Sequence, residues 1–256
     1  MDLLTIYAQM GLSKAVCDRG EEILSRLTDR FRAIDQRAEI NQAKVLLAMQ
    51  KNRIGAQHFA ATTGYGYDDD GRERLEKVYA DVFHTEAALV RPQITCGTHA
   101  LTVALSANLL PGDELLSPVG LPYDTLQEVI GIRPSPCSLA EYGVTYRQAD
   151  LKPDGSFDYD AIRAAITPKT RLVTIQRSKG YATRPSFSVQ QIGELITFCK
   201  SVKPDVKVMV DNCYGEFVDV VEPSDVGADM VVGSLIKNPG GGLAPIGGYI
   251  CGTQEC

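Results

Sequence analysis

The sequence predicts an α/β fold in which a mostly parallel sheet is sandwiched by helices. Short apolar segments rich in β-branched residues alternate along the chain with segments of helical periodicity. Two apolar segments, residues 206–211 (VKVMVD) and 229–236 (DMVVGSLI), are continuous rather than alternating, as strands buried on both faces of a parallel sheet are. Because strand–helix–strand units place parallel strands side by side with helices over their faces, this order predicts a single α/β sheet.

The N-terminal part is predicted to be a helical arm. Residues 13–53 lack proline and are rich in Glu, Arg, Lys, Ala and Leu. Their large apolar residues recur at intervals of three to four: Ile23, Leu27, Phe31 and Ile34. We therefore assign residues 1–55 to an N-terminal helical segment and residues 56–256 to the large domain. Glycines and aspartates predict a loop over residues 61–72 (ATTGYGYDDDGR).

Beyond this loop, helical and strand patterns take turns. The helical patterns lie at residues 73–83, 95–110 (a turn and a helix), 123–131, 158–166 and 188–202. The strand patterns lie at residues 87–94, 113–119, 143–151, 170–176, 206–211, 229–236 and 249–256 (a strand and a turn). Ligands of such sheets bind beyond the carboxyl ends of the strands, so a site is expected there.

The composition argues against several classes of partner. The 256 residues carry a formal net charge of −6 with no basic cluster, which disfavours nucleic acid and anionic membranes. No apolar run is long enough to span a bilayer, and the N-terminus, MDLLTIYAQM, lacks the basic region of a secretory signal. Seven scattered cysteines without a CxxC pair, and three dispersed histidines, favour free thiols in a cytoplasmic protein over a disulfide framework or a metal site.

An anion site is predicted where a strand gives way to a helix in residues 95–100 (TCGTHA). The N–H groups at the start of a helix, together with the Thr98 hydroxyl, suit a phosphate, and Gly97 suits the turn. The same residues also suit an ordinary turn followed by an N-cap, so this motif alone does not decide between the two.

Two further polar residues follow apolar strands. Asp211 ends residues 206–211, where a carboxylate either caps the next segment or holds a protonated ring nitrogen positive. Lys237 follows residues 229–236 and precedes a glycine cluster; it is either a solvated strand end or an amine that forms a Schiff base. Ser234 can add a phosphate contact. Together these features offer a phosphate site, a pyridinium partner and an aldehyde-binding amine, as pyridoxal phosphate requires.

At this point the sequence resembles a known family. The segments VDNCYGEF and GADMVVGSLIKNPGGGLAPIGGYICG are similar to the fold type I pyridoxal-phosphate enzymes of cysteine and methionine metabolism. The segments GYGYDDDGRERLEKVYADVF, CGTHAL and TIQRSKGY look most like the branch described as aluminium-resistance or methionine γ-lyase-like proteins. The resemblance runs from about residue 55 to the end and implies the large domain of the PLP-dependent transferase-like fold.

The resemblance implies how pyridoxal 5′-phosphate is bound. Lys237 carries it covalently as an internal aldimine, and Asp211 pairs with its pyridine nitrogen. Gly97 and Thr98 bind its phosphate through the backbone, and Ser234 through the side chain.

An aromatic residue near residue 65 is implied to reach the phosphate of a neighbouring subunit. Tyr65 and Tyr67 lie where family members place this tyrosine, but Tyr-Gly-Tyr replaces the usual Tyr-x-Arg, so either one can fill the role. Arg72 is a candidate for the displaced cation; the alternative is a solvated arginine near a helix start.

Other matching positions are less specific. Tyr123, in LPYDTL, matches a tyrosine that stacks on the cofactor ring, although ordinary packing explains it almost as well. His99 is a candidate cofactor contact, with packing in the first helical turn as the alternative. Arg177 and Ser178 follow a strand beside the expected site and are candidates for substrate binding or, equally, for a surface loop.

The function implied by the resemblance is a carbon–sulfur lyase that acts on a small amino acid by β- or γ-elimination. Lys237 would take the α-proton while Asp211 keeps the ring nitrogen protonated. An aminotransferase, and a pyridoxal-phosphate-binding protein without turnover, remain open as alternatives. A homodimer or homotetramer is expected, because the sites of the family borrow phosphate contacts from a second subunit.

The resembled chains continue into a smaller C-terminal domain whose arginine holds the substrate carboxylate. No arginine follows Arg184 in this sequence. We therefore expect that the small domain is absent from this chain and that the chain alone turns amino acids over poorly. The alternative is a compact variant in which Arg177 or Arg184 holds the carboxylate.

Overall fold

The structure, a computed structural model, describes residues 2–61, 69–91 and 93–256. The chain falls into two compact units, Met1–Ala43 and Lys44–Cys256. In the described part, the helices are α1 (Leu3–Gln9), α2 (Lys14–Lys51), α3 (Asp70–Val82), α4 (Gly97–Asn108), α5 (Asp124–Ile130), α6 (Tyr159–Ala165) and α7 (Val189–Val202), with short 3₁₀ turns η1 (Ala56–Phe59), η2 (Pro223–Val226) and η3 (Asn238–Gly240). The strands are β1 (Ala87–Leu89), β2 (Glu114–Ser117), β3 (Thr145–Gln148), β4 (Thr170–Gln176), β5 (Lys207–Asp211), β6 (Met230–Ser234) and β7 (Gly248–Gly252).

The first unit consists of α1 and most of α2. Asp2 caps α1, because its carboxylate accepts a hydrogen bond from the Thr5 N–H at 2.8 Å. Along α2 an apolar stripe recurs at helical spacing, and its members are exposed by 38–57%: Val16, Ile23, Leu27, Phe31 and Ile34. None of the described helices is long and apolar enough to cross a membrane.

The boundary between the units lies inside α2, before the predicted boundary after residue 55. The reason is packing: Ala48 is only 4% exposed in the core of the second unit, and Val45, Met49 and Ile54 pack against the same core. The helical periodicity of residues 13–53 continues through this point, so sequence alone gives no sign of the division.

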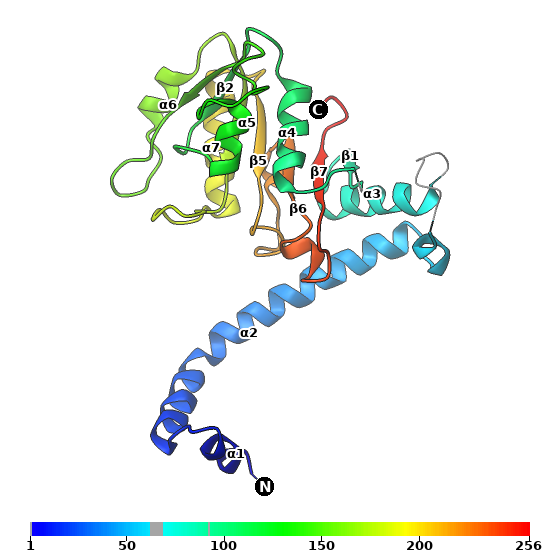
Figure 1. The fold of residues 1–256 in the computed structure, drawn as a ribbon, viewed down its shortest axis with the longest axis vertical. Helices are drawn as coiled ribbons and strands as arrows, with labels where there is room; N and C mark the ends of the chain where they lie inside the picture. The colour runs from blue at the N-terminus through cyan, green and yellow to red at the C-terminus, as the bar shows by residue number, and fades with distance from the viewer. Residues whose placement is uncertain (1, 62–68, 92) are drawn as a thin grey trace. The chain divides into compact units, whose positions relative to one another are not determined.

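The second unit is built on a seven-stranded sheet, counted over the described residues, in the order β1-β7-β6-β5-β4-β2-β3. The strands from β6 to β3 are parallel, as predicted, whereas β7 runs antiparallel to both β6 and β1. Figure 1 shows β7, in red, between β6 and β1. The mostly parallel α/β class is therefore confirmed, and β7, next to the edge strand β1, is the one antiparallel strand among the described residues.

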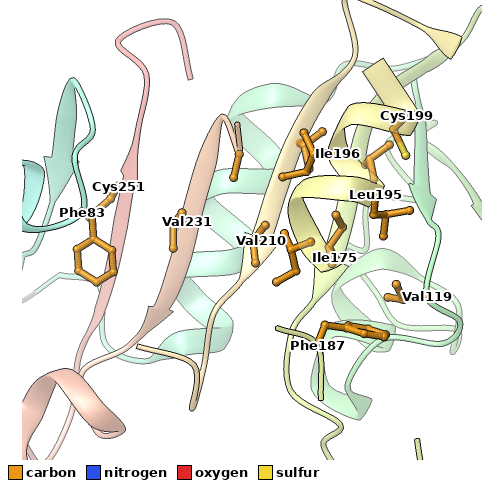
Figure 2. Close-up of a cluster of buried hydrophobic side chains, with 14 of the residues drawn as sticks. Phe83, Val119, Ile175, Phe187, Leu195, Ile196, Cys199, Val210, Val231 and Cys251 are labelled. Carbon is orange, nitrogen blue, oxygen red and sulfur yellow. The ribbon is translucent and has the colours of Figure 1, made fainter. Parts of the chain in front are cut away.

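Successive strand residues face opposite sides of the sheet and supply two separate cores. Val208 and Val210 of β5 join one core with residues of α3, α6 and α7, whereas Met209 joins the other with residues of α4 and α5. Figure 2 shows the first core, where Leu195 and Ile196 of α7 point toward the sheet. Helices thus cover both faces, which leaves the strand ends as the place for a site.

The strand register brings two polar residues together at the carboxyl edge. Gln176, the last residue of β4, pairs with Asp211, the last residue of β5, and Asp211 pairs with Val232 of β6. Ser234 ends β6 two residues further on. The polar residues predicted for the ends of β5 and β6, Asp211 and Ser234, therefore lie on neighbouring strands at one edge of the sheet.

Candidate active site

A pocket of about 470 Å³ lies at the carboxyl ends of β4, β5 and β6 beside the start of α4. Seven of the predicted site residues line it: Gly97, Thr98, Tyr123, Ser178, Asp211, Ser234 and Lys237. The strand-end rule therefore located the site, although the role of each residue remains a prediction.

The start of α4 forms one wall and presents donors to the pocket. Cys96 is the N-cap, and its sulfur accepts from the His99 N–H at 3.4 Å. The N–H groups of Gly97 and Thr98 have no partner within the helix, because the first N–H groups of an α-helix have no preceding turn to donate to. A Cβ at Gly97 would lie 3.0 Å from the Ser234 Cβ, so glycine is what lets the helix start approach β6. These donors and the Ser234 hydroxyl suit an anion.

Asp211 places a buried carboxylate at the pocket floor. It is 6% exposed, and its Oδ1 accepts from the Cys213 N–H at 3.1 Å. Among the described residues no cationic side chain pairs with it, and burial raises the pKa of the Asp211 carboxyl. A cation at this position would offset that desolvation, so the pocket suits a ligand that carries a protonated nitrogen.

Lys237 supplies the amine of the pocket. It is partly buried beyond the end of β6, and its Nζ donates to the Tyr214 hydroxyl at 2.6 Å. The glycines behind it are required sterically: a Cβ at Gly240 would lie 1.8 Å from the Leu235 carbonyl oxygen. The glycine cluster thus gives the chain a tight return path behind the lysine.

Tyr123 lies over the pocket at the N-terminus of α5. Its ring stacks on that of Tyr181 with centroids 5.6 Å apart, and its backbone N–H donates to Gln176 Oε1 at 2.7 Å. The Gln176 Nε2 donates to the Ser178 carbonyl at 3.0 Å. Gln176 therefore ties together the two loops that border the pocket.

Arg177 does not enter the pocket, contrary to its predicted role in binding substrate. It is 3% exposed, and its guanidinium donates to Asn212 Oδ1 at 2.9 Å, to the Gly215 carbonyl at 2.8 Å and to Asp219 Oδ2 at 2.8 Å. The physical reason is strand alternation: Gln176 faces the pocket, so the next residue points away from it.

Arg184, the alternative carboxylate clamp, is also outside the pocket lining. Its guanidinium donates to the Gln176 and Ser178 carbonyls at 2.8 and 2.7 Å and lies over the Phe187 ring. The compact-variant alternative, in which Arg177 or Arg184 holds the substrate carboxylate, therefore finds no support in their contacts.

Four other candidates lie away from the pocket or outside the described residues. The His99 Nδ1 accepts from the Thr95 N–H at 3.3 Å, so the ring turns back along its own helix start rather than lining the pocket. Arg72 pairs with Asp69 at 3.0 Å at the start of α3. Tyr65 and Tyr67 lie outside the described residues, so their roles stay predictions.

Sequence reasoning missed several residues of the pocket. Gln176, Lys179, Tyr181 and Tyr214 all line it. Gln176 carried the same signal as Asp211, since both end apolar strands at the carboxyl edge. No comparable signal marked Tyr214, whose position depends on a left-handed backbone conformation.

A second buried carboxylate lies close behind the site. Glu216 is 0% exposed; its Oε1 accepts from the Tyr249 hydroxyl at 2.8 Å, while its Oε2 has no hydrogen-bond partner among the described residues. Burial raises the pKa of Glu216 from 4.5 to about 7.

This carboxylate predicts a pH dependence of folding stability. The unfolded chain releases the Glu216 proton near pH 4.5 and the folded chain only near pH 7, so the free energy of unfolding falls as the pH rises through this window. Glu216→Gln should remove about 2–3 kcal/mol of the decrease between pH 5 and pH 8. Urea unfolding at both pH values measures it. The exposed Glu21→Gln serves as the control, and an unchanged decrease in Glu216→Gln would contradict the prediction.

The residues of the pocket fit pyridoxal phosphate. The start of α4 and Ser234 present donors that suit its phosphate, and the Lys237 amine lies in the same pocket. No cationic side chain among the described residues pairs with the buried Asp211 carboxylate, which suits a protonated pyridine. Among residues 2–61, 69–91 and 93–256, no cluster of three or more His, Cys, Asp or Glu side chains suits a metal ion.

The sheet and the helices that cover its faces are those of fold type I pyridoxal-phosphate enzymes. The pyridoxal-5′-phosphate-dependent protein YhfS of Escherichia coli shares the fold at 18% identity, with a TM-score of 0.62 over 87% of this chain and 56% of that one. The chain belongs to the methionine gamma-lyase family, which matches residues 16–256.

Relatives of higher identity align with most of this sequence. The uncharacterized protein YnbB of Bacillus subtilis is 52% identical over 236 residues, which is 91% of this chain and 56% of YnbB. A carbon-sulfur lyase involved in aluminum resistance from Clostridium novyi is 44% identical, with a TM-score of 0.93 over 98% of this chain and 60% of that one. A cystathionine gamma-synthase of Mycobacterium leprae is 28% identical over 192 residues, 75% of this chain and 45% of the relative. This chain thus spans between about half and three fifths of the length of these relatives.

Proposed function

We propose that the chain is the cofactor-binding part of a pyridoxal-phosphate-dependent carbon–sulfur lyase. The observation that carries this proposal is one pocket that gathers the Lys237 amine, the buried Asp211 carboxylate and the donors at the start of α4. Family membership supports the same class of chemistry. The activity proposed is that of the whole protein, because this chain spans only 56% and 60% of the length of two of its relatives.

Each residue of the pocket has a distinct task in this proposal. The N–H groups of Gly97 and Thr98 and the Ser234 hydroxyl would bind the phosphate, and Lys237 would hold the cofactor covalently. The Asp211 carboxylate would keep the proton on the pyridine nitrogen, and Tyr123 would pack against the ring. Bound pyridoxal phosphate supplies an electron sink that stabilises negative charge at the substrate α-carbon.

The free Lys237 amine would take the α-proton of the bound substrate. The carbon–sulfur bond then breaks, and the thiol leaves with the bonding electron pair and a proton. Water provides the oxygen of the 2-oxo acid, and the amino group leaves as ammonia, so no oxidant or reductant is needed. A sulfur on the β-carbon gives pyruvate, and a sulfur on the γ-carbon gives 2-oxobutyrate.

Product analysis tests the proposal. The full-length protein, loaded with pyridoxal phosphate, is incubated with cystathionine and with methionine, and thiol, ammonia and 2-oxo acid are measured. A lyase releases the three in equal amounts without an added acceptor. A requirement for a 2-oxo acid acceptor, with no thiol released, would instead identify an aminotransferase, and bound cofactor without products would identify a non-catalytic binding protein.

We also propose that the protein is a homodimer or homotetramer. The apolar stripe of α2 supports this, because an exposed run of large apolar side chains is typical of a surface that another chain covers. Leu27→Glu, in the stripe, should weaken association as measured by light scattering, whereas Gln36→Glu, on the opposite side of the helix, should not. A monomeric parent chain that binds the cofactor tightly would contradict the proposal.

A further inference from the structure

The turn between β5 and η2 is held by the buried side chain of Arg177. Its Nη1 donates both to Asn212 Oδ1 at 2.9 Å and to the Gly215 carbonyl at 2.8 Å, so one nitrogen joins the two ends of residues 212–215. The Asn212 Nδ2 donates in turn to the fully buried Glu222 at 3.0 Å. A Cβ at Gly215 would lie 2.5 Å from the Arg177 Cδ and 2.6 Å from Asn212 Oδ1, so the turn closes tightly around the guanidinium.

Tyr214 lies inside this closed turn in a conformation that tyrosine rarely adopts. Its φ is +67°, in the left-handed region that favours glycine. Such a backbone persists when its surroundings fix it, and here the Arg177 hydrogen bonds fix the residues on either side, Asn212 and Gly215. The Tyr214 side chain is 58% exposed, so packing of its ring does not explain the conformation.

The left-handed turn has one clear result: it places the Tyr214 phenol on the Lys237 amine. The Lys237 Nζ donates to the Tyr214 hydroxyl at 2.6 Å and lies 4.3 Å from the centre of its ring. Both a hydrogen bond and a cation–π contact therefore hold the amine at the pocket wall.

We propose that Arg177 is a positioning residue which, by fixing the turn of residues 212–215, holds the Tyr214 phenol against Lys237 and so sets where the Lys237 amine lies in the pocket. This inference rests on the proposed function, in which Lys237 is the reactive amine. It gives Arg177 a role at the site without contact with the substrate.

The test measures how readily the Lys237 amine is acetylated in protein freed of pyridoxal phosphate. Brief acetylation with isotope-labelled acetic anhydride at one fixed pH, followed by mass spectrometry, gives the labelling of Lys237 relative to Lys179 of the same pocket and to the exposed Lys152. Tyr214→Phe keeps the ring and removes only the hydroxyl. We expect it to raise the Lys237 to Lys179 ratio about fivefold, the factor that corresponds to one net hydrogen bond of about 1 kcal/mol.

Arg177 is tested through the same ratio. Arg177→Lys keeps the charge but loses the planar fork, and Gly215→Ala distorts the turn without changing any charge; each should raise the ratio to a similar extent. In the Tyr214→Phe background neither change should add a further increase, because both act through the missing hydroxyl. Unfolding curves establish that each variant is folded.

Two results would overturn the inference. An unchanged ratio in Tyr214→Phe would remove the role of Tyr214, and multiplying effects in the double variants would show that Arg177 acts by another route. If both turn variants failed to fold, Tyr214→Phe would still decide whether the phenol holds the amine. A failure of the proposed function is distinguishable, since cofactor fixed to another lysine would leave the labelling ratios as predicted.

Discussion

Lys237→Ala should abolish covalent attachment of pyridoxal phosphate and lower the rate of thiol release at least about 10³-fold. The substitution removes both the amine that carries the cofactor and the base that takes the α-proton, and loss of a general base alone costs about 10²–10⁴-fold. The proposed phosphate donors at the start of α4 remain, so cofactor should still bind without a covalent link. Borohydride reduction followed by peptide mapping measures the attachment.

Lys179→Ala is the matched control for this experiment. Lys179 lines the same pocket but is exposed on the loop that follows β4. Its variant should retain covalent cofactor on Lys237 and most of the product formation. Borohydride label on Lys179 or Lys200 in the parent protein would refute the assignment of Lys237.

Asp211→Asn should retain much of the bound cofactor yet slow the exchange of the substrate α-proton by about 10²-fold or more. The amide has almost the same shape but no negative charge, so it cannot stabilise the protonated pyridine on which the charge separation depends. In the proposed site, the affinity for the cofactor comes largely from phosphate contacts made by other residues. Exchange is measured by mass spectrometry of the amino acid in deuterated buffer, and bound cofactor by absorbance.

Asp205→Asn provides the comparison, because Asp205 is an exposed carboxylate that pairs with Lys203. It should leave both cofactor content and exchange unchanged. Exchange at the parent rate in Asp211→Asn would show that the carboxylate has a structural rather than an electronic role.

Periodicity and strand ends account for most of what could be predicted from the sequence. The continuous apolar runs before Asp211 and Lys237 identified β5 and β6, and because these strands are parallel neighbours, the residues that end them meet in one pocket. Helix α4 followed from its glycine start and apolar face. By contrast, the antiparallel pairing of β1 with β7 joins two segments that lie far apart in the sequence, so no local pattern indicates it.

The errors at the site have a common physical origin in side-chain direction. Arg177 was placed at the right strand end, but it follows Gln176, the last residue of β4, and this one-residue step reverses the side to which a side chain points. Tyr214 was missed because a left-handed tyrosine contradicts local preference and is imposed by tertiary contacts. Sequence patterns thus located the edge of the sheet but not the direction of each group along it.

The position of β7 has a consequence for the order in which the protein can fold during synthesis. Leu89 of β1 pairs with Ile250 of β7, so the hydrogen-bonding edge of β1 leaves the ribosome long before its partner is made. At ordinary rates of translation the delay is on the order of ten seconds. The parallel strands β2, β3, β4 and β5 pair with one another, and β5 also pairs with β6. All of these strands are made before β7, so they can assemble during that interval. In the growing chain, β7 is therefore the last of these strands to pair, and it enters between β6 and β1. The edge of the pocket that β6 forms gains its second neighbouring strand only at that late step.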